Sequence, residues 1–354
     1  MLKKENRTAP KSNKDFFMQK KEWSEIKDTH LTCYLPQYFQ KVLMTRRPIF
    51  YVDCFAGKSR FDDGKDGSPR IALSIRSDAL RKTSAHNPRI NTCFIDLHHA
   101  SDLQANIADY LDCSPQVIWG KFECEIENLL TNESRNNVFL YIDPYGYQAL
   151  DFSLFEKFAK MDFQSIELLI NMNSFGLFRD ACRVMKVTRQ QSDDAFTNLG
   201  DIVEYDPIRI DSSTKSEILI TSVCGGDYWK AIVEDYNARI INGYEAEERL
   251  SAEYRWQLKQ NYNYVLDMPI RIPRFSANHA CSSHILHCTC RVVRKIITIY
   301  KNHILKCLLH RQAHFVRMSI TIFSPSCLSL ILSVMLSQPL SSPIFGSFCF
   351  AGGV

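Results

Sequence analysis

Three acidic residues each stand directly after a short apolar run, and they are the side chains best suited to do chemistry. They are Asp53, Asp96 and Asp143. In an open sheet of parallel strands, ligands bind in the crevice beyond the carboxyl ends of the central strands. If the three apolar runs are neighbouring strands of one sheet, the three carboxylates therefore lie at the edge of one ligand site.

The segment after the first run predicts a loop that approaches a ligand closely. Phe55 and Ala56 lead to Gly57, and a glycine lets the backbone come near a bound group because it has no Cβ. Asp53, at the strand end, could orient the amino group of an amino-acid moiety, and Asp96 could accept hydrogen bonds from both hydroxyls of a ribose. Together these residues predict a nucleoside ligand, although a single glycine and a strand-end aspartate also occur in ordinary turns.

The segment Asp143-Pro144-Tyr145-Gly146 predicts chemistry on a planar amine. The Asp143 carboxylate and the adjoining backbone carbonyl could accept hydrogen bonds from the amine, and the Tyr145 ring could stack on the face of the substrate. The alternative is a tight turn, because Asp-Pro and Tyr-Gly are plausible turn dipeptides. The functional interpretation is favoured here because Asp143, like Asp53 and Asp96, stands directly after an apolar run.

Alternating strand and helix patterns predict the framework that positions these residues. Apolar runs typical of buried strands lie at residues 49–52, 92–95, 116–119, 138–142 and 166–171. Segments with apolar residues at three- and four-residue steps separate them, which is the spacing of amphipathic helices. This alternation predicts an α/β fold, a doubly wound, mostly parallel, Rossmann-like sheet with helices on both faces.

Further elements are expected before and after this framework. A helix begins at Trp23, and Pro36 should kink or split it, because proline lacks the amide hydrogen that a helix interior uses. Residues 218–256 should form mixed helix and strand that closes the domain, and residues 263–272 should form a late strand. No strand pair that would complete the sheet after this late strand is recognisable.

A series of short motifs between residues 15 and 272 carries a more specific signal. In chain order they are Trp23-Ser24-Glu25-Ile26-Lys27, Tyr34-Leu35, Tyr38, Val52-Asp53-Cys54-Phe55-Ala56-Gly57, Gly67-Ser68-Pro69, Phe94-Ile95-Asp96 and Ile142-Asp143-Pro144-Tyr145-Gly146, with Glu167-Leu168-Leu169-Ile170-Asn171 and Arg179 extending the series. This order resembles the three-Cys-motif partner protein family, TcmP. The three cysteines of that name belong to the partner protein, so the resemblance makes no demand on cysteines in this chain.

The resemblance implies a fold like that of class I methyltransferases, with S-adenosylmethionine as the cofactor and a three-Cys-motif protein as a partner. By position, it implies that the cofactor is held by Asp53, Phe55, Ala56, Gly57 and Asp96, and that the methyl-acceptor side is lined by Asp143, Pro144 and Tyr145. Two positions depart from the family. Ser59 stands where a second loop glycine is usual, and Lys121 stands where an acidic or amide residue usually touches adenine.

The distribution of charge divides the chain into three parts. Residues 1–22 are polar and basic and predict a flexible arm, and residues 23–272 hold the methyltransferase-like α/β domain with its N-terminal helix. Nine of the 43 Lys and Arg residues lie after Asp267, but none of the 39 acidic residues does. Residues 273–354 are therefore interpreted as an aberrant tail, frame-altered or poorly folded. Loss of the closing strands would leave an unpaired sheet edge.

The leading functional hypothesis is an S-adenosylmethionine-dependent methyltransferase that acts on an amine. Nucleic acid is the favoured acceptor because of the Asp-Pro-Tyr segment and the basic arm, although the net acidic balance of residues 1–267 weighs against it. One alternative is a non-catalytic partner protein that docks onto a radical or metal-cluster protein. Another is a truncated, inactive gene product, for which the unusual tail is the reason.

Location and other ligands are predicted from the same sequence. No metal site is expected, because the spacing of Cys and His after residue 280 fits no usual ligand pattern. A membrane span is not expected either, because polar residues and proline interrupt the apolar stretch at residues 320–340. The polar opening segment lacks the features of a secretion signal, which predicts a cytoplasmic, reducing environment with cysteines as thiols.

Overall fold

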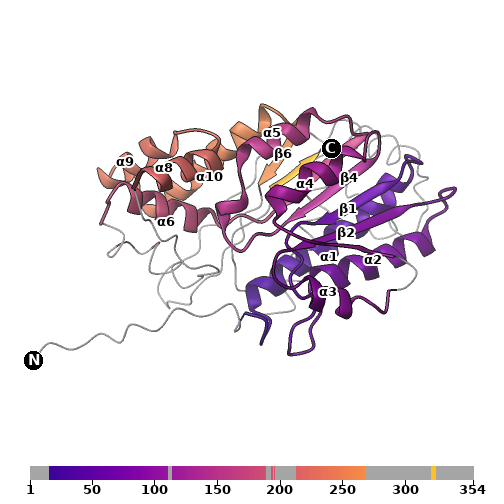
Figure 1. The fold of residues 1–354 in the computed structure, drawn as a ribbon. Coiled ribbons are helices and arrows are strands. Elements are labelled where there is room, and N and C mark those ends of the chain that lie inside the picture. Colours follow the sequence, from indigo (N-terminus) through magenta and orange to yellow (C-terminus); the bar gives the residue numbers. More distant parts are fainter. Residues whose placement is uncertain are drawn as a thin grey trace, which may run out of the picture.

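The computed structural model describes residues 16–110, 114–188, 193, 195, 213–267 and 320–323 (Figure 1). At its centre is a sheet with the strand order β3-β2-β1-β4-β5-β7-β6. Five parallel strands make up most of it: β1 (Ile49–Asp53), β2 (Ile90–Asp96), β3 (Gln116–Trp119), β4 (Asn137–Ile142) and β5 (Ser165–Ile170). The predicted doubly wound, mostly parallel, Rossmann-like sheet is therefore confirmed.

Helices cover both faces of the sheet, which is why its central strands are mostly apolar. Every residue of β1, β4 and β5 is buried. Successive residues of a strand point to opposite faces, so Tyr51 packs in one core cluster and Val52 in the other. The Tyr51 cluster is covered by α1 (Glu22–Leu43), α2 (Ser68–Lys82) and α3 (Ala100–Asn106).

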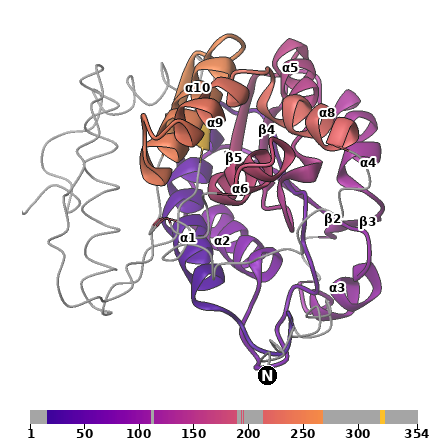
Figure 2. The same ribbon diagram turned by 90° about the vertical axis from the view of Figure 1, so that its left-hand side faces the viewer.

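The second face of the sheet carries a thicker helical layer. It is built from α4 (Phe122–Thr131), α5 (Phe152–Lys160), α6 (Ser174–Val184), α8 (Ser213–Cys224), α9 (Trp229–Asn237) and α10 (Gly243–Lys259) (Figure 2). The prediction of mixed helix and strand over residues 218–256 is wrong, because the structure has helices there. Ile220 and Val223 are both fully buried on one side of α8, whereas Ile218 is exposed, so a helical face explains the apolar run.

The N-terminal helix continues through its proline. Pro36 lies inside α1, so the predicted split does not occur. Leu35 and Phe39, on either side of it, are completely buried against the sheet. An interior proline costs a helix about 3 kcal/mol, and the burial of these two side chains contributes a comparable amount.

The sheet is closed by two short strands that follow the parallel five. β6 (Tyr264–Asp267) confirms the start of the predicted late strand, and β7 (Ile320–Phe323) comes from the tail. β7 runs antiparallel between β5 and β6. No closing strand pair was recognisable in the sequence, and the structure corrects this in part, because one such strand, β7, pairs with both β5 and β6. Apart from β7, the interpreted tail at residues 273–354 lies outside the described residues.

The described part of the chain holds neither a long apolar helix nor a metal cluster. None of its helices is long and apolar enough to cross a membrane. None of its groups of His, Cys, Asp and Glu side chains is arranged to hold a metal ion. The cysteines within it are free thiols, namely Cys33, Cys54, Cys93, Cys124, Cys182 and Cys224.

Candidate functional site

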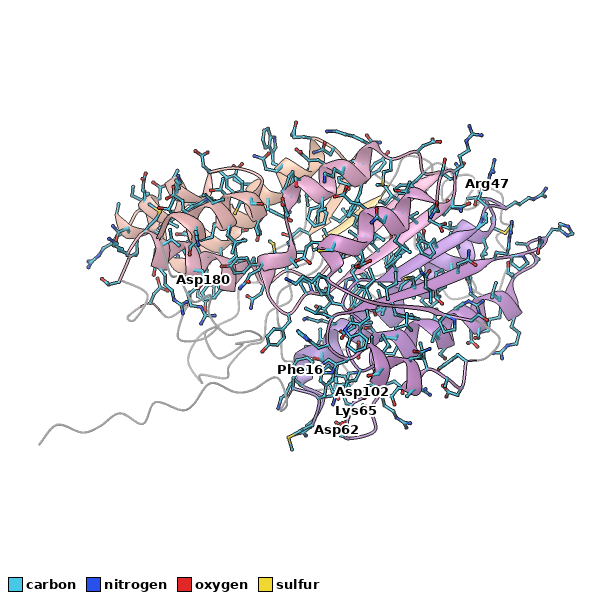
Figure 3. All side chains as sticks on the ribbon, viewed as in Figure 1. Phe16, Arg47, Asp62, Lys65, Asp102 and Asp180 are labelled. Carbon is cyan, nitrogen blue, oxygen red and sulfur yellow. The ribbon has the colours of Figure 1, made fainter. Side chains whose placement is uncertain are left out.

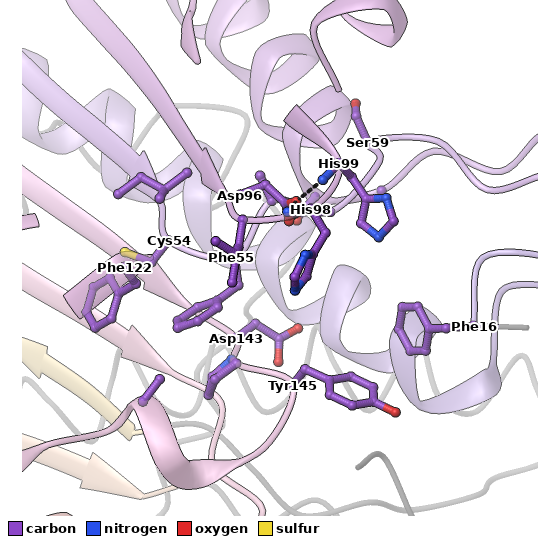
Figure 4. Close-up of a pocket in the computed structure, with 18 of the residues that line it drawn as sticks. Phe16, Cys54, Phe55, Ser59, Asp96, His98, His99, Phe122, Asp143 and Tyr145 are labelled. Atoms are coloured by element: carbon purple, nitrogen blue, oxygen red, sulfur yellow. Dashed lines mark hydrogen bonds between the residues drawn. The ribbon is translucent and has the colours of Figure 1, made fainter. Parts of the chain in front are cut away.

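The order of the sheet creates a crevice at its carboxyl edge. The chain runs outward from β1 to β2 and β3 and then returns to β4 beside β1, so the connections diverge between β1 and β4. Ligands of doubly wound sheets bind at such a switch point. The structure has a cavity of about 530 Å³ at this place (Figure 4).

Seven of the eight predicted site residues line this cavity. They are Phe55, Ala56, Gly57, Asp96, Asp143, Pro144 and Tyr145. The eighth, Asp53, has no exposed surface and lies behind the cavity wall. Its Oδ1 accepts a hydrogen bond from the Phe55 amide at 3.3 Å, so the carboxylate holds the loop from behind.

Asp53 is also electrostatically unusual. Burial raises the pKa of its carboxyl group to about 7, and hydrogen bonds from Ser68 and from the Phe55 amide oppose that rise only in part. The nearby carboxylates of Asp143 and Asp28 raise it further. A substantial fraction of Asp53 is therefore protonated near neutral pH.

The loop after β1 is bound to the end of β2 through Asp96. The Gly57 amide donates to Asp96 Oδ2 at 2.9 Å, and the His98 amide donates to Oδ1 at 2.8 Å. A third amide, that of His99, also donates to Oδ1. A carboxylate has four lone-pair sites, so Asp96 keeps accepting capacity toward the cavity that it lines.

Gly57 is required at its position by both conformation and space. Its φ is +60°, in the left-handed region that glycine adopts without strain. A Cβ on this residue would come within 3.0 Å of the Phe17 ring. The sequence motif and the structure therefore agree on why a glycine stands in the loop.

Ser59 occupies a position with the same conformational demand. Its φ is +68°, and its side chain is 2% exposed. Its hydroxyl oxygen has no hydrogen-bond partner in the structure, although the residue lines the cavity. The carbonyl of Ser59 accepts a hydrogen bond from the Gly67 amide at 2.7 Å, which holds the loop closed on itself.

Substitution of Ser59 by glycine is expected to stabilise the protein. It removes a side chain from the left-handed region and a buried hydroxyl without a partner, and these gains exceed the entropy that glycine adds to the unfolded chain. The expected gain in unfolding free energy is about 1 kcal/mol, measured by urea denaturation. Ser59→Ala is the matched control, because it removes the hydroxyl but keeps the strained backbone. An equal gain in both variants would contradict the role given to the backbone.

The end of the cavity at Asp143 contains an ion pair between segments far apart in the sequence. Lys27 Nζ, on α1, lies 2.8 Å from Asp143 Oδ1, after β4. The Tyr141 hydroxyl donates to Asp143 Oδ2 at 3.4 Å and accepts from Asn171 Nδ2 at 3.0 Å. Asp143 is thus held by donors from α1 and from its own strand.

A second ion pair lies beside the first. Lys20 is bonded to the carboxylate of Asp28 and to the backbone carbonyl of Asp66, and its amide donates to Asp63 Oδ2 at 3.1 Å. Burial raises the pKa of Asp28 to about 6, and the positive charge of Lys20 opposes this rise. Sequence reasoning did not identify these residues, because nothing local connects Lys20 with Asp28 or Asp66.

The segment of residues 16–20, called the strap from here on, lies across the cavity. The Phe17 ring packs on the His99 ring with centroids 4.8 Å apart, and the Phe16 ring meets the Tyr145 ring edge to face at 6.0 Å. The Asp62 amide donates to the Phe17 carbonyl at 2.8 Å. Figure 3 marks Phe16 and Asp62 at the same end of the molecule.

The prediction of a flexible arm over residues 1–22 stays untested for most of its length. Within its described part, Phe16 and Phe17 are partly buried against the domain, Lys20 is 8% exposed, and Met18 is exposed. Residues 1–15 lie outside the described residues. The aromatic pair Phe16-Phe17 was the available signal, since two adjacent rings are unusual in a solvated arm.

The far end of the cavity lies after β2 and β3. Leu97, Gly120 and Phe122 line it, and the Phe122 ring packs on the Phe55 ring with centroids 5.2 Å apart. Lys121, the N-cap residue of α4, also lines this end. This end of the cavity thus combines apolar surface from Leu97 and Phe122 with the charge of Lys121.

Comparisons with known proteins add no further identification. No protein-family model matches the chain. No curated protein matches it either. The geometry of the cavity and the sequence motifs that line it are therefore the observations that bear on function.

Proposed function

We propose that this protein is an S-adenosylmethionine-dependent methyltransferase that acts on an amine. The observation that carries the proposal is the joining of two predicted motifs in one cavity. The loop of Phe55 to Gly57 with Asp96 forms one part of its wall, and the segment Asp143 to Tyr145 forms another. A parallel, Rossmann-like sheet is compatible with a methyltransferase-like fold.

The cavity fits the chemical groups of this cofactor. Three amides use three of the four lone-pair sites of Asp96, so one remains to accept from a ribose hydroxyl, and Leu97 with Phe122 supplies apolar surface for a purine ring. Ser59 also lines the cavity, and its buried hydroxyl oxygen has no hydrogen-bond partner in the structure. A volume of about 530 Å³ is within the range of cofactor pockets, which is roughly 300–1,000 Å³.

The chain's own residues would orient the acceptor amine. When bound, the cofactor supplies an electrophilic methyl group on a positively charged sulfur. Asp143 accepts a hydrogen bond from the amine and so directs its nitrogen lone pair, and the half-exposed ring of Tyr145 offers a face to a planar acceptor. The strap contributes Phe16, Phe17 and Lys20 to the wall of the site. A nucleobase in nucleic acid is the acceptor that these groups suit best.

The proposal is tested by binding and transfer with the full chain. We expect S-adenosylhomocysteine to bind at one site per chain in a calorimetric titration. With tritiated S-adenosylmethionine, we expect label to pass to single-stranded DNA in wild type but not in Asp143→Ala. A folded chain that binds no S-adenosylhomocysteine would rule the proposal out.

Removal of the Phe17 ring is expected to speed the loss of bound ligand. Phe17 contacts His99, Phe61 and the Gly57 loop, so Phe17→Ala weakens the closure of the strap. Each lost aromatic contact contributes about 1 kcal/mol, which predicts an approximately tenfold faster dissociation of S-adenosylhomocysteine. Stopped-flow displacement measures this rate. Phe163→Ala, a substitution away from the cavity, should leave it unchanged.

A second candidate function is a non-catalytic role as partner of a three-Cys-motif protein in the cytoplasm. The observation that favours it is Ser59, which places a side chain in the cavity where the family usually has glycine. This role predicts binding of S-adenosylhomocysteine without methyl transfer to DNA. Transfer that depends on Asp143 would exclude it.

A further inference from the structure

The lysines of the cavity differ in how firmly they are held. Three lysines line it: Lys20, Lys27 and Lys121. Lys20, the last residue of the strap, is buried and has two partners, and Lys121 lies at the other end of the cavity, after β3. Lys27 is the one bonded to the acceptor-side carboxylate, and it comes from the motif Trp23 to Lys27, to which the proposed function gives no role.

The Lys27–Asp143 pair is placed so that it can be exchanged. The side chains of Lys27 and Asp143 are 12% and 22% exposed, so both reach the cavity and neither is sealed in the core. Asp143 has the Tyr141 hydroxyl as a second donor, and this contact remains if Lys27 turns away. Lys27 can therefore change its partner, because the Asp143 carboxylate still accepts the hydrogen bond from Tyr141.

The acidic groups around this pair explain why a lysine is needed here. Asp143 raises the pKa of both Asp28 and Asp53, so the three carboxylates lie within electrostatic reach of one another. A ligand carboxylate at this end of the cavity would be repelled by Asp143 and by the ionised fractions of Asp28 and Asp53. Of the two lysines at this end, the Lys27 side chain is 12% exposed, whereas the Lys20 side chain is 6% exposed and is bonded both to Asp28 and to the backbone carbonyl of Asp66.

We propose that Lys27 exchanges partners, pairing with Asp143 in the present structure and with the carboxylate of the cofactor's amino-acid end when the cofactor is bound. The exchange frees Asp143 Oδ1 to accept from the acceptor amine. Cofactor binding thereby prepares the acceptor side, and the cofactor binds first. This inference rests on the proposed function, since it takes an adenosyl amino acid as the ligand.

Two ligands and three variants of the full chain test the exchange by calorimetry. S-adenosylhomocysteine carries the amino-acid end, and 5′-methylthioadenosine lacks it. Lys27→Met should weaken S-adenosylhomocysteine binding roughly 10- to 100-fold, as expected for a lost charged hydrogen bond. Asp143→Asn should strengthen it about threefold or more, because the competing carboxylate is gone. Lys27→Arg should restore most of the affinity, and 5′-methylthioadenosine should bind all four proteins alike.

The opposite signs of the two effects are the distinguishing result. If Lys27→Met and Asp143→Asn both weaken S-adenosylhomocysteine, the ion pair is a fixed structural contact and the exchange is refuted. The same holds if Lys27→Met weakens both ligands equally. If wild type binds neither ligand, the proposed function fails, and the exchange fails with it. If wild type binds both ligands but Lys27→Met changes neither affinity, only the exchange fails.

Discussion

Replacement of Asp96 by alanine is expected to weaken the binding of S-adenosylhomocysteine at least about 100-fold. The substitution removes the carboxylate that would accept from a ribose hydroxyl in the proposed complex, and it removes the acceptor for the Gly57, His98 and His99 amides. One hydrogen bond to a charged group contributes roughly 1.5–3 kcal/mol, and the upper end of this range corresponds to a loss of this size. The loop of Phe55 to Gly57 would also lose its connection to the end of β2, which adds to the effect.

Calorimetric titration of the full chain measures this loss, and two further variants make it interpretable. Asp96→Asn keeps the shape and one acceptor oxygen, so we expect an intermediate weakening of roughly tenfold. Asp102→Ala is the matched control, because Asp102 is an exposed aspartate on α3 that does not line the cavity. Wild-type affinity in a folded Asp96→Ala protein would show that Asp96 does not contact the ligand. It would also remove the main support for a nucleoside site.

Replacement of Asp53 by asparagine is expected to change how stability depends on pH. The pKa of Asp53 is about 7 in the folded protein, whereas an unperturbed aspartate, as in the unfolded chain, has a pKa of 3.8. Between these values the unfolded chain releases a proton that the folded chain retains, so stability falls as the pH rises through this window. Below pH 3.8 the stability is fully present, and above pH 7 the whole loss has occurred.

The expected size follows from the shift. One pKa unit corresponds to about 1.4 kcal/mol, so Asp53 contributes a loss of roughly 2–3 kcal/mol in unfolding free energy between pH 5 and pH 8. Asp53→Asn keeps an oxygen for the Phe55 amide and removes this loss, so it should be more stable than wild type at pH 8. Asp28 and Glu167, whose pKa values burial also raises, leave part of the slope in place.

Urea denaturation at pH 5 and pH 8 distinguishes the outcomes. Asp102→Asn, at an exposed position, reports the slope that the rest of the chain produces. The same pH slope in Asp53→Asn and wild type would mean that the Asp53 carboxyl group is ionised in the folded protein over the whole range. In that case a counter-charge would have to reach it from the cavity.

The main strands could be read from the sequence because their signal is local. A run such as residues 138–142 is apolar throughout, which only a strand buried on both faces requires, and β4 spans Asn137–Ile142. Parallel strands end at one edge, so Asp96 and Asp143 were predicted to meet from their positions in the sequence alone, and both line the same cavity. The need for glycine at Gly57 was equally local, because it follows from φ.

The errors arose where a local pattern has more than one solution. Residues 218–220 are as apolar as a strand, but only packing shows that Ile220 is buried and Ile218 exposed, as on a helix. Pro36 disfavours a continuous helix locally, and burial of the residues beside it outweighs that preference. Asp53 ends β1 as predicted, but its carboxylate is fully buried and does not line the cavity.

The sequence by itself determined the class of fold, the central strands and the strand-end residues that surround the site, because periodicity and chain direction are short-range properties. The tertiary structure alone decided which distant groups meet. It placed the strap of residues 16–20 over the cavity, paired Lys27 with Asp143 and inserted β7 between β5 and β6. These contacts join segments that lie as many as about 150 residues apart, such as Leu168 and Ile322. A local sequence pattern cannot predict them, because they depend on which distant segments pack together.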